Sequence, residues 1–121
     1  MDTEIRSSEW PSFFDMFSRQ HYGWLVTVEE IPAGTGAGHV EARALPLQGV
    51  SANPRDATIS IAVGAEADRH LTHTIANPTH VFVEWTAHGA ERGLRIERQG
   101  GPATRVRFRA AVRPEEVDGF V

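Results

Sequence analysis

The chain has 121 residues, of which 40% are hydrophobic and 23% are charged, and its formal net charge is −4. This length and composition predict one globular domain over residues 1–121, and we expect residues 1–6 and 113–121 to be flexible. Cysteine is absent and all twelve basic residues are arginine, which excludes disulfides, thiolate metal sites, cysteine nucleophiles and lysine Schiff bases.

An aromatic stripe near the N-terminus identifies the first element. Its members are Trp10, Phe13, Phe14 and Phe17. Because residues three and four apart lie on one face of a helix, the stripe predicts an amphipathic helix. The helix begins after Ser8, holds Pro11 in its first turn and ends near Gly23. We expect the stripe to pack on a sheet rather than to form a groove for a partner.

Alternating apolar residues predict five to six strands after this helix. The pattern runs through residues 24–29, 39–50, 58–63, 81–85, 94–96 and 106–108. Pro46 interrupts the second stretch, which predicts an edge strand or a bend. We interpret the glycine-rich segment 34–38 as a hairpin loop, because a dinucleotide-binding loop must open a helix and a strand follows here. Residues 53–56 predict a type I turn.

A second, short helix is predicted over residues 66–76. Ala67, Leu71 and Ile75 are spaced four apart, and Asn77 and Pro78 follow as terminators. The predicted fold class is therefore α+β: a bent antiparallel sheet of five to six strands with an N-terminal amphipathic helix and a short second helix. A small Sm-like or SH3-like barrel is one variant of this architecture.

Three stretches of the chain resemble a known family. They are Glu9-Trp10-x-x-Phe13-Phe14-Asp15, then Leu45-Pro46-Leu47-x-Gly49-Val50 leading to Asn53-Pro54-x-Asp56, and Leu71-x-His73-x-Ile75-x-x-Pro78-x-x-Val81-x-Val83-Glu84. Across most of residues 9–109 the chain resembles small bacterial proteins of a domain-of-unknown-function family, DUF5335. The resemblance implies a bacterial origin and a stand-alone domain, and it implies no activity, substrate or site.

Three residues of the predicted second helix suggest a metal site. Glu66, His70 and His73 would share one helix face, opposite the apolar stripe, and their side chains could hold zinc for hydrolysis. However, the pattern lacks the His-Glu-x-x-His spacing of zinc helices, and any surface helix carries polar residues on its outer face. We expect no metal or other cofactor, and a small metal-dependent enzyme remains the alternative. His73 is the better single candidate for a binding residue.

Arg105, Arg107 and Arg109 lie on one face of the last predicted strand and suggest a phosphate-binding ribbon. Arg95 and Glu97 lie on the strand expected to face them, so ion pairs across the sheet explain the pattern without a ligand. No aromatic residue interleaves the arginines to stack on bases. With the acidic net charge, this makes nucleic-acid binding a second alternative that we do not favour.

No nucleophile and base pair, phosphate loop or strong metal spacing is visible in the sequence. We therefore expect a non-enzymatic binding or assembly module with no catalytic residues. Residues 1–9 lack the apolar run of a signal peptide, and no stretch approaches the ~18 apolar residues of a membrane span. We expect a cytoplasmic protein without a membrane partner.

The apolar residues on both faces of several strands predict self-association. Phe82 and Leu25 lie on faces opposite Val81, Val83 and Trp24, and one helix cannot cover both faces. A homodimer would supply the missing cover, because one surface patch serves both partners. Phe82 is the expected interface residue. The chemistry of any other protein or small-molecule partner does not follow from the sequence.

Overall fold

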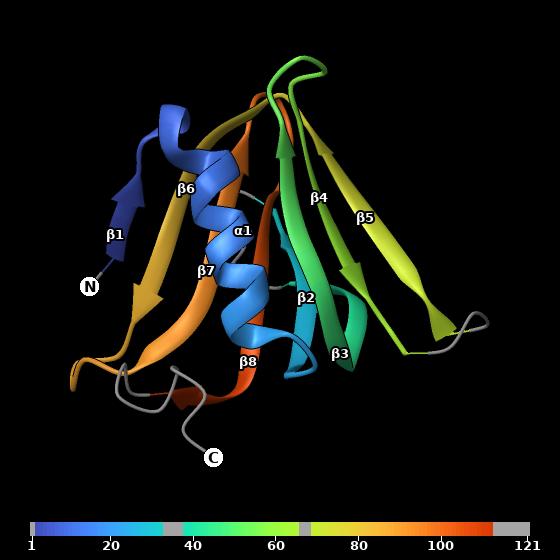
Figure 1. Cartoon of the computed structure of the whole chain (residues 1–121), viewed down its shortest axis with the longest axis vertical. Coiled ribbons are helices and arrows are strands. Elements are labelled where there is room, and N and C mark those ends of the chain that lie inside the picture. The colour runs from blue at the N-terminus through green and yellow to red at the C-terminus, as the bar shows by residue number, and fades with distance from the viewer. Residues whose placement is uncertain (1, 33–37, 66–68, 113–121) are drawn as a thin grey trace.

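The structure is a computed structural model, and it describes residues 2–32, 38–65 and 69–112, with side chains up to residue 109 (Figure 1). A short 3-10 helix η1 (Ser7–Glu9) leads into helix α1 (Trp10–His21). The strands are β1 (Asp2–Ile5), β2 (Leu25–Ile31), β3 (His39–Asn53), β4 (Thr58–Val63), β5 (Leu71–Ala76), β6 (Pro78–Trp85), β7 (Glu91–Arg98) and β8 (Ala103–Val112). Neither helix of this described part is long and apolar enough to span a membrane.

The strands form one open sheet in the order β1-β6-β7-β8-β2-β3-β4-β5, and every neighbouring pair is antiparallel. Strand β3 is where the sheet bends. Its first half pairs with β2 as far as Pro46, and its second half, from Leu47, pairs with β4. The predicted bend at Pro46 is thus confirmed, and β2 and β3 pair antiparallel on either side of segment 33–37, which lies outside the described residues.

Helix α1 fills the gap that opens where β3 leaves β2. The Ser18 hydroxyl accepts a hydrogen bond from the Val50 amide at 2.8 Å and donates one to the Val50 carbonyl at 3.0 Å. The free edge of β3 is therefore bonded by the helix instead of by a strand. Phe14 and Phe17 are fully buried, while Trp10 and Phe13 are half-buried against the core. The predicted helix and its inward-facing stripe are confirmed.

The core lies on the concave face of the bent sheet, between its two halves and helix α1. Alternate residues of each long strand point into it, which is the pattern expected of a sheet with one solvated face. The residues with no measurable exposure are Phe14, Val26, Val28, Leu47, Ile59, Ile61, Val81, Leu94, Ile96 and Val106. Burying each of these side chains contributes about 1.5–3 kcal/mol to stability.

Three features of the predicted fold need correction. The segment predicted as a second helix holds strand β5 from Leu71 to Ala76, and residues 66–68 lie outside the described residues. The described sheet has eight strands rather than five to six. The two strands that were not predicted, β1 and β5, are the edge strands of the sheet. The sheet is also open rather than closed into a small barrel. The α+β class itself holds.

Candidate ligand-binding pocket

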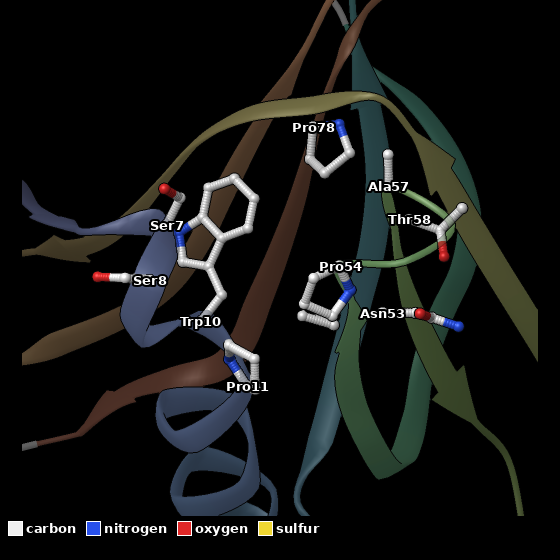
Figure 2. Close-up of a pocket in the computed structure, with 10 residues that line it drawn as sticks. Ser7, Ser8, Trp10, Pro11, Asn53, Pro54, Ala57, Thr58 and Pro78 are labelled. Carbon is white, nitrogen blue, oxygen red and sulfur yellow. The ribbon is translucent and has the colours of Figure 1, made fainter.

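A pocket of about 360 Å³ lies where the start of helix α1 meets the turn between β3 and β4. Figure 2 shows Trp10 on one side of it and Pro54 and Pro78 on the other. The remaining lining residues are Ser7, Ser8, Pro11, Ala52, Asn53, Ala57 and Thr58. Three parts of the chain that are distant in sequence thus build one concavity: η1 with the first turn of α1, the β3–β4 turn with its flanking strand ends, and the start of β6.

The indole of Trp10 is held in place from its polar edge. Its Nε1–H donates a hydrogen bond to the Ile5 carbonyl at 2.9 Å. Pro11 follows at the start of the helix, where its missing N–H leaves no partner unsatisfied. The ring is half-buried and packs against the core with its apolar surface. A tryptophan with its only donor satisfied internally offers a ligand an apolar wall rather than a hydrogen bond.

The opposite wall is a turn held by hydrogen bonds. The Asn53 side chain binds Asp56 twice, donating to its carboxylate at 2.9 Å and accepting from its amide at 3.3 Å. Ala57 has a φ of 53°, and its carbonyl accepts a hydrogen bond from the Asn77 amide at 2.8 Å. This last bond ties the turn to the start of β6 and so fixes Pro54 relative to Pro78. A turn is present at the predicted place, but it covers residues 54–57, and its backbone hydrogen bond runs from the Ala57 amide to the Pro54 carbonyl at 3.3 Å, one residue later than predicted.

The chemistry of the lining favours a neutral, mainly apolar ligand. Among the described residues, those that line the pocket include no charged side chain. Indole, proline rings and alanine methyl groups supply most of the wall, and hydroxyl and amide groups supply the polar contacts. Small-molecule sites have this character, with volumes of roughly 300–1,000 Å³. A charged ligand would lose its hydration here without gaining a counter-ion.

A comparison with family profiles matches residues 1–117 to the family of unknown function DUF5335. The chain belongs to this family. No curated protein and no solved structure matches it. The pocket joins the three stretches that carry the DUF5335 resemblance, because Trp10 comes from the first, Pro54 from the second and Pro78 from the third. Membership in DUF5335 identifies no ligand. The class of ligand therefore has to be inferred from the shape and chemistry of the pocket.

The residues proposed as a metal site do not share a helix face. His73 lies on β5, on the same inner face as Leu71 and Ile75, with its Nε2 3.3 Å from the Thr104 hydroxyl and 3.7 Å from a Glu30 carboxylate oxygen. His70 is exposed before β5 begins, and Glu66 lies outside the described residues. Within residues 2–32, 38–65 and 69–112, no three His, Cys, Asp or Glu side chains are grouped to hold a metal.

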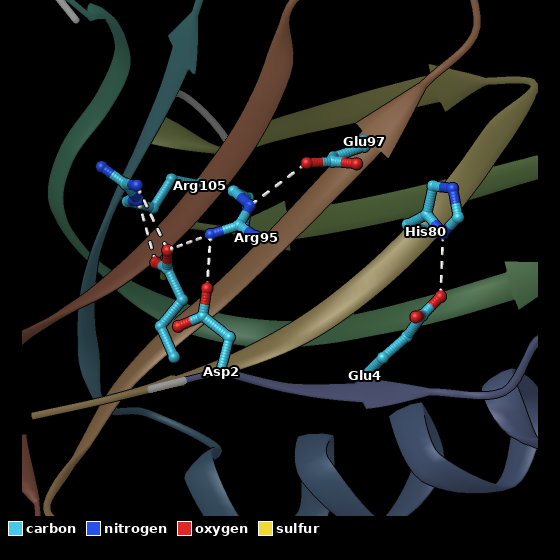
Figure 3. A network of polar contacts seen from close by, with 7 residues as sticks. Asp2, Glu4, His80, Arg95, Glu97 and Arg105 are labelled. Carbon is cyan, nitrogen blue, oxygen red and sulfur yellow. Dashed lines mark hydrogen bonds and ion pairs between the residues drawn. The ribbon is translucent and has the colours of Figure 1, made fainter.

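The arginine ribbon of β8 lies on the outer face of the sheet, and Arg105 and Arg107 are paired with carboxylates; Figure 3 shows the network around Arg105. Arg105 forms two hydrogen bonds with the Glu84 carboxylate, at 2.9 and 3.2 Å, and Arg107 lies 3.5 Å from Glu29. Arg109 is exposed. Ion pairs across the sheet are present as predicted, although the main partner is Glu84 of β6 rather than Glu97. This pairing weakens the phosphate-binding alternative.

Arg95 is the centre of the same network. It donates to Asp2 at 2.8 Å and to Glu84 at 2.9 Å, and it lies 3.4 Å from Glu97. Burial opposes its charged form, but the hydrogen bond and charge of Asp2, together with Glu84, raise the pKa of Arg95 above its ordinary value. Glu84 therefore separates two arginines that lie directly opposite each other on β7 and β8.

Phe82 lies in this network rather than on a bare apolar surface. It is half-buried on β6, and the Arg95 guanidinium lies over its ring, 4.5 Å from the centroid. The ring of His80 lies beside it at a centroid distance of 6.0 Å. The segment predicted as a second helix holds β5 from Leu71 to Ala76, so its described residues supply no helix to cover Phe82. The guanidinium group of Arg95 thus covers one face of the Phe82 ring, a contact that the sequence pattern did not predict.

The sequence did not identify the pocket as a site. Trp10 was assigned to the core and Pro54 to a turn, and both assignments are compatible with the structure. The available signal was that each of the three family-like stretches contains a proline or tryptophan next to a helix start or turn. Only the fold shows that these ends meet.

Proposed function

We propose that the protein is a non-enzymatic binding module whose Trp10 pocket holds a neutral, mainly apolar small molecule. The observation that supports this most directly is the uncharged pocket of about 360 Å³ between Trp10 and the two prolines Pro54 and Pro78. Its walls are held by hydrogen bonds within the protein, so the pocket exists before a ligand arrives. Binding to a preformed site therefore loses little conformational entropy of the protein.

The proposal is tested with a neutral fluorescent probe, N-phenylnaphthylamine, whose emission rises in an apolar site. The wild-type protein should enhance the emission in a saturable way. Trp10→Ala removes one wall, and we expect it to weaken binding at least tenfold, since a buried aromatic contact contributes about 1.5 kcal/mol or more. Ala57→Glu would introduce a charge into the pocket and should also abolish enhancement.

Tyr22→Ala is the matched control, because Tyr22 is a 65% exposed aromatic residue outside the pocket. This variant should bind the probe as the wild type does. Equal enhancement by wild type and Trp10→Ala, with both proteins folded by circular dichroism, would contradict the pocket as the binding site. No saturable enhancement by the wild type at all would contradict an apolar small-molecule site.

We also propose that this module acts as a homodimer in the cytoplasm and that it needs no metal. Light scattering on the wild type at tens of micromolar concentration tests the first part, and a monomer would contradict it. Elemental analysis of the purified protein tests the second part. Stoichiometric zinc that disappears in a His73→Ala variant would instead support a metal-dependent enzyme.

A further inference from the structure

The two edges of the sheet differ in a way that bears on self-association. Strand β1 has four residues, and two of them, Asp2 and Glu4, are acidic. Short, charged edges resist the addition of another strand. Strand β5 has six residues, Leu71-Thr72-His73-Thr74-Ile75-Ala76, with no Asp, Glu, Arg or Pro among them.

Strand β5 also has no irregularity that would turn it away from a partner. It pairs with β4 in continuous register from Thr58 opposite Ala76 to Val63 opposite Leu71. Within the described part of the chain β4 is its one neighbouring strand, and Figure 1 shows β5 at the periphery of the molecule. Alternate backbone N–H and C=O groups of an edge strand point outward and can pair with a further strand.

We propose that β5 pairs antiparallel with β5 of a second copy, which joins two sheets across a two-fold axis. This rests on the homodimer put forward under the proposed function and assigns its surface. Residues that lie opposite each other in an antiparallel pair share one face, so an axis through His73 places Thr72 opposite Thr74 of the partner subunit. It also places Leu71 opposite Ile75 of the partner subunit.

This register makes the edge self-complementary. Threonine pairs and pairs of aliphatic side chains both stabilise neighbouring strands. Thr72 and Thr74 are exposed on the outer face, whereas Leu71 and Ile75 continue the apolar inner face. Each chain carries a net charge of −4, and β5 lets two such chains meet without placing acidic side chains against each other. The strand offers no Asp, Glu or Arg side chain to an unrelated charged peptide, and its one histidine, His73, already lies 3.7 Å from a Glu30 carboxylate oxygen.

The test places lysine on the exposed outer face of the edge. Thr72→Lys combined with Thr74→Lys sets like charges opposite each other in the proposed register, and lysine on an edge blocks strand addition. The wild type should have about twice the mass of the 13.3 kDa chain by light scattering. The double variant should be a folded monomer. The control, Ser12→Lys with Ala87→Lys, adds the same charge at two exposed positions on α1 and in the β6–β7 turn and should remain a dimer.

The possible outcomes distinguish two claims: that the protein is a dimer, and that β5 forms its interface. A monomeric wild type contradicts both. A dimer that survives the β5 lysines but dissociates in Phe82→Asp contradicts the β5 edge and places the interface on the outer face of β6. If the lysine variant unfolds, amide hydrogen exchange of the wild type is the deciding measurement. Dilution below the concentration at which the dimer dissociates should lower the protection of the β5 amides. Unchanged protection of these amides would overturn the proposal.

Discussion

Glu84 shows how one carboxylate organises the outer face of the sheet. Arg95 and Arg105 are directly opposite each other on adjacent strands, an arrangement that is destabilising unless an anion lies between them. Glu84 binds both guanidinium groups, and its side chain is only 12% exposed. The sequence predicted ion pairs across the sheet but did not identify Glu84 as the partner, because Glu84 lies 11 and 21 residues from the arginines. Only the strand order brings the three residues together.

Replacing Glu84 by glutamine should therefore destabilise the fold. The change keeps the shape of the side chain but removes the charge between Arg95 and Arg105, and we expect a loss of about 2 kcal/mol in the free energy of unfolding. Urea denaturation measures the loss. Glu97→Gln is the control, since Glu97 is 41% exposed and lies farther from Arg95, and it should cost less than about 0.5 kcal/mol. Equal effects of the two changes would contradict the role given to Glu84.

His80 offers a pH-dependent test of the β1 edge. Its hydrogen bond with the Glu4 carboxylate, at 2.8 Å, raises the pKa of His80 above its ordinary value of 6.5. A raised folded-state pKa stabilises the fold below the ordinary pKa of histidine, and this contribution disappears as the pH rises through the folded pKa. Nuclear magnetic resonance (NMR) titration of His80 should show its pKa fall in a Glu4→Gln variant. An unchanged titration would mean that β1 does not pair with β6 in this register.

At the scale of elements, β5 explains why the sequence predicted a helix wrongly. Residues four apart lie on one face in both a helix and a strand, so Leu71 and Ile75 fit either pattern. Thr72, Thr74 and Ile75 are β-branched and favour a strand, and the alternation through His73 is the pattern that the fold uses. Strand β1 was missed for a different reason. Its polar residues show no pattern of their own and are ordered by partners on β6 and β7.

Helix α1, β4 and the bend at Pro46 could be predicted because their signals are local. An aromatic stripe, a strict alternation and a proline each act within a few residues. The pocket could not be predicted, since it depends on where three distant parts of the chain meet. The ion-pair network depends in the same way on strand order, which hydrophobic patterns do not determine.

Gly93 marks a place where two strands approach closely. It lies on β7 beside an irregularity in the pairing with β8, and its φ is 144°. A Cβ atom added there would lie 1.9 Å from the Val106 carbonyl oxygen. Gly93→Ala should cost about 3 kcal/mol or more, or prevent folding, because backbone must move to relieve the contact. Chemical denaturation measures the loss.

Gly89 provides the control for this substitution. It also has a positive φ, of 79°, but a Cβ atom there would meet nothing within 4 Å. Gly89→Ala should therefore cost only the conformational penalty of about 1 kcal/mol. Similar losses for Gly89→Ala and Gly93→Ala would contradict the close approach of β7 and β8.

At the scale of the whole molecule, the two faces of the bent sheet differ in the residues that they carry. The concave side holds the core, and the outer face carries the ion pairs around Glu84. The Trp10 pocket lies at the start of the helix, whereas β5 lies at an edge of the sheet (Figure 1). A ligand in the pocket and a second copy at β5 would therefore contact different segments. We expect probe binding to be unchanged in the monomeric β5 lysine variant.

The most direct test of the binding pocket uses the indole N–H signals of the three tryptophans. Trp10 lines the pocket, while Trp24 packs on Phe108 and Trp85 donates to the Thr3 hydroxyl, so the latter two are internal controls. In a ¹⁵N–¹H NMR titration with N-phenylnaphthylamine, the Trp10 signal and the amides of Asn53 and Ala57 should shift saturably while the other two indole signals stay in place. Shifts at Trp24 or Trp85 without a shift at Trp10 would contradict the account.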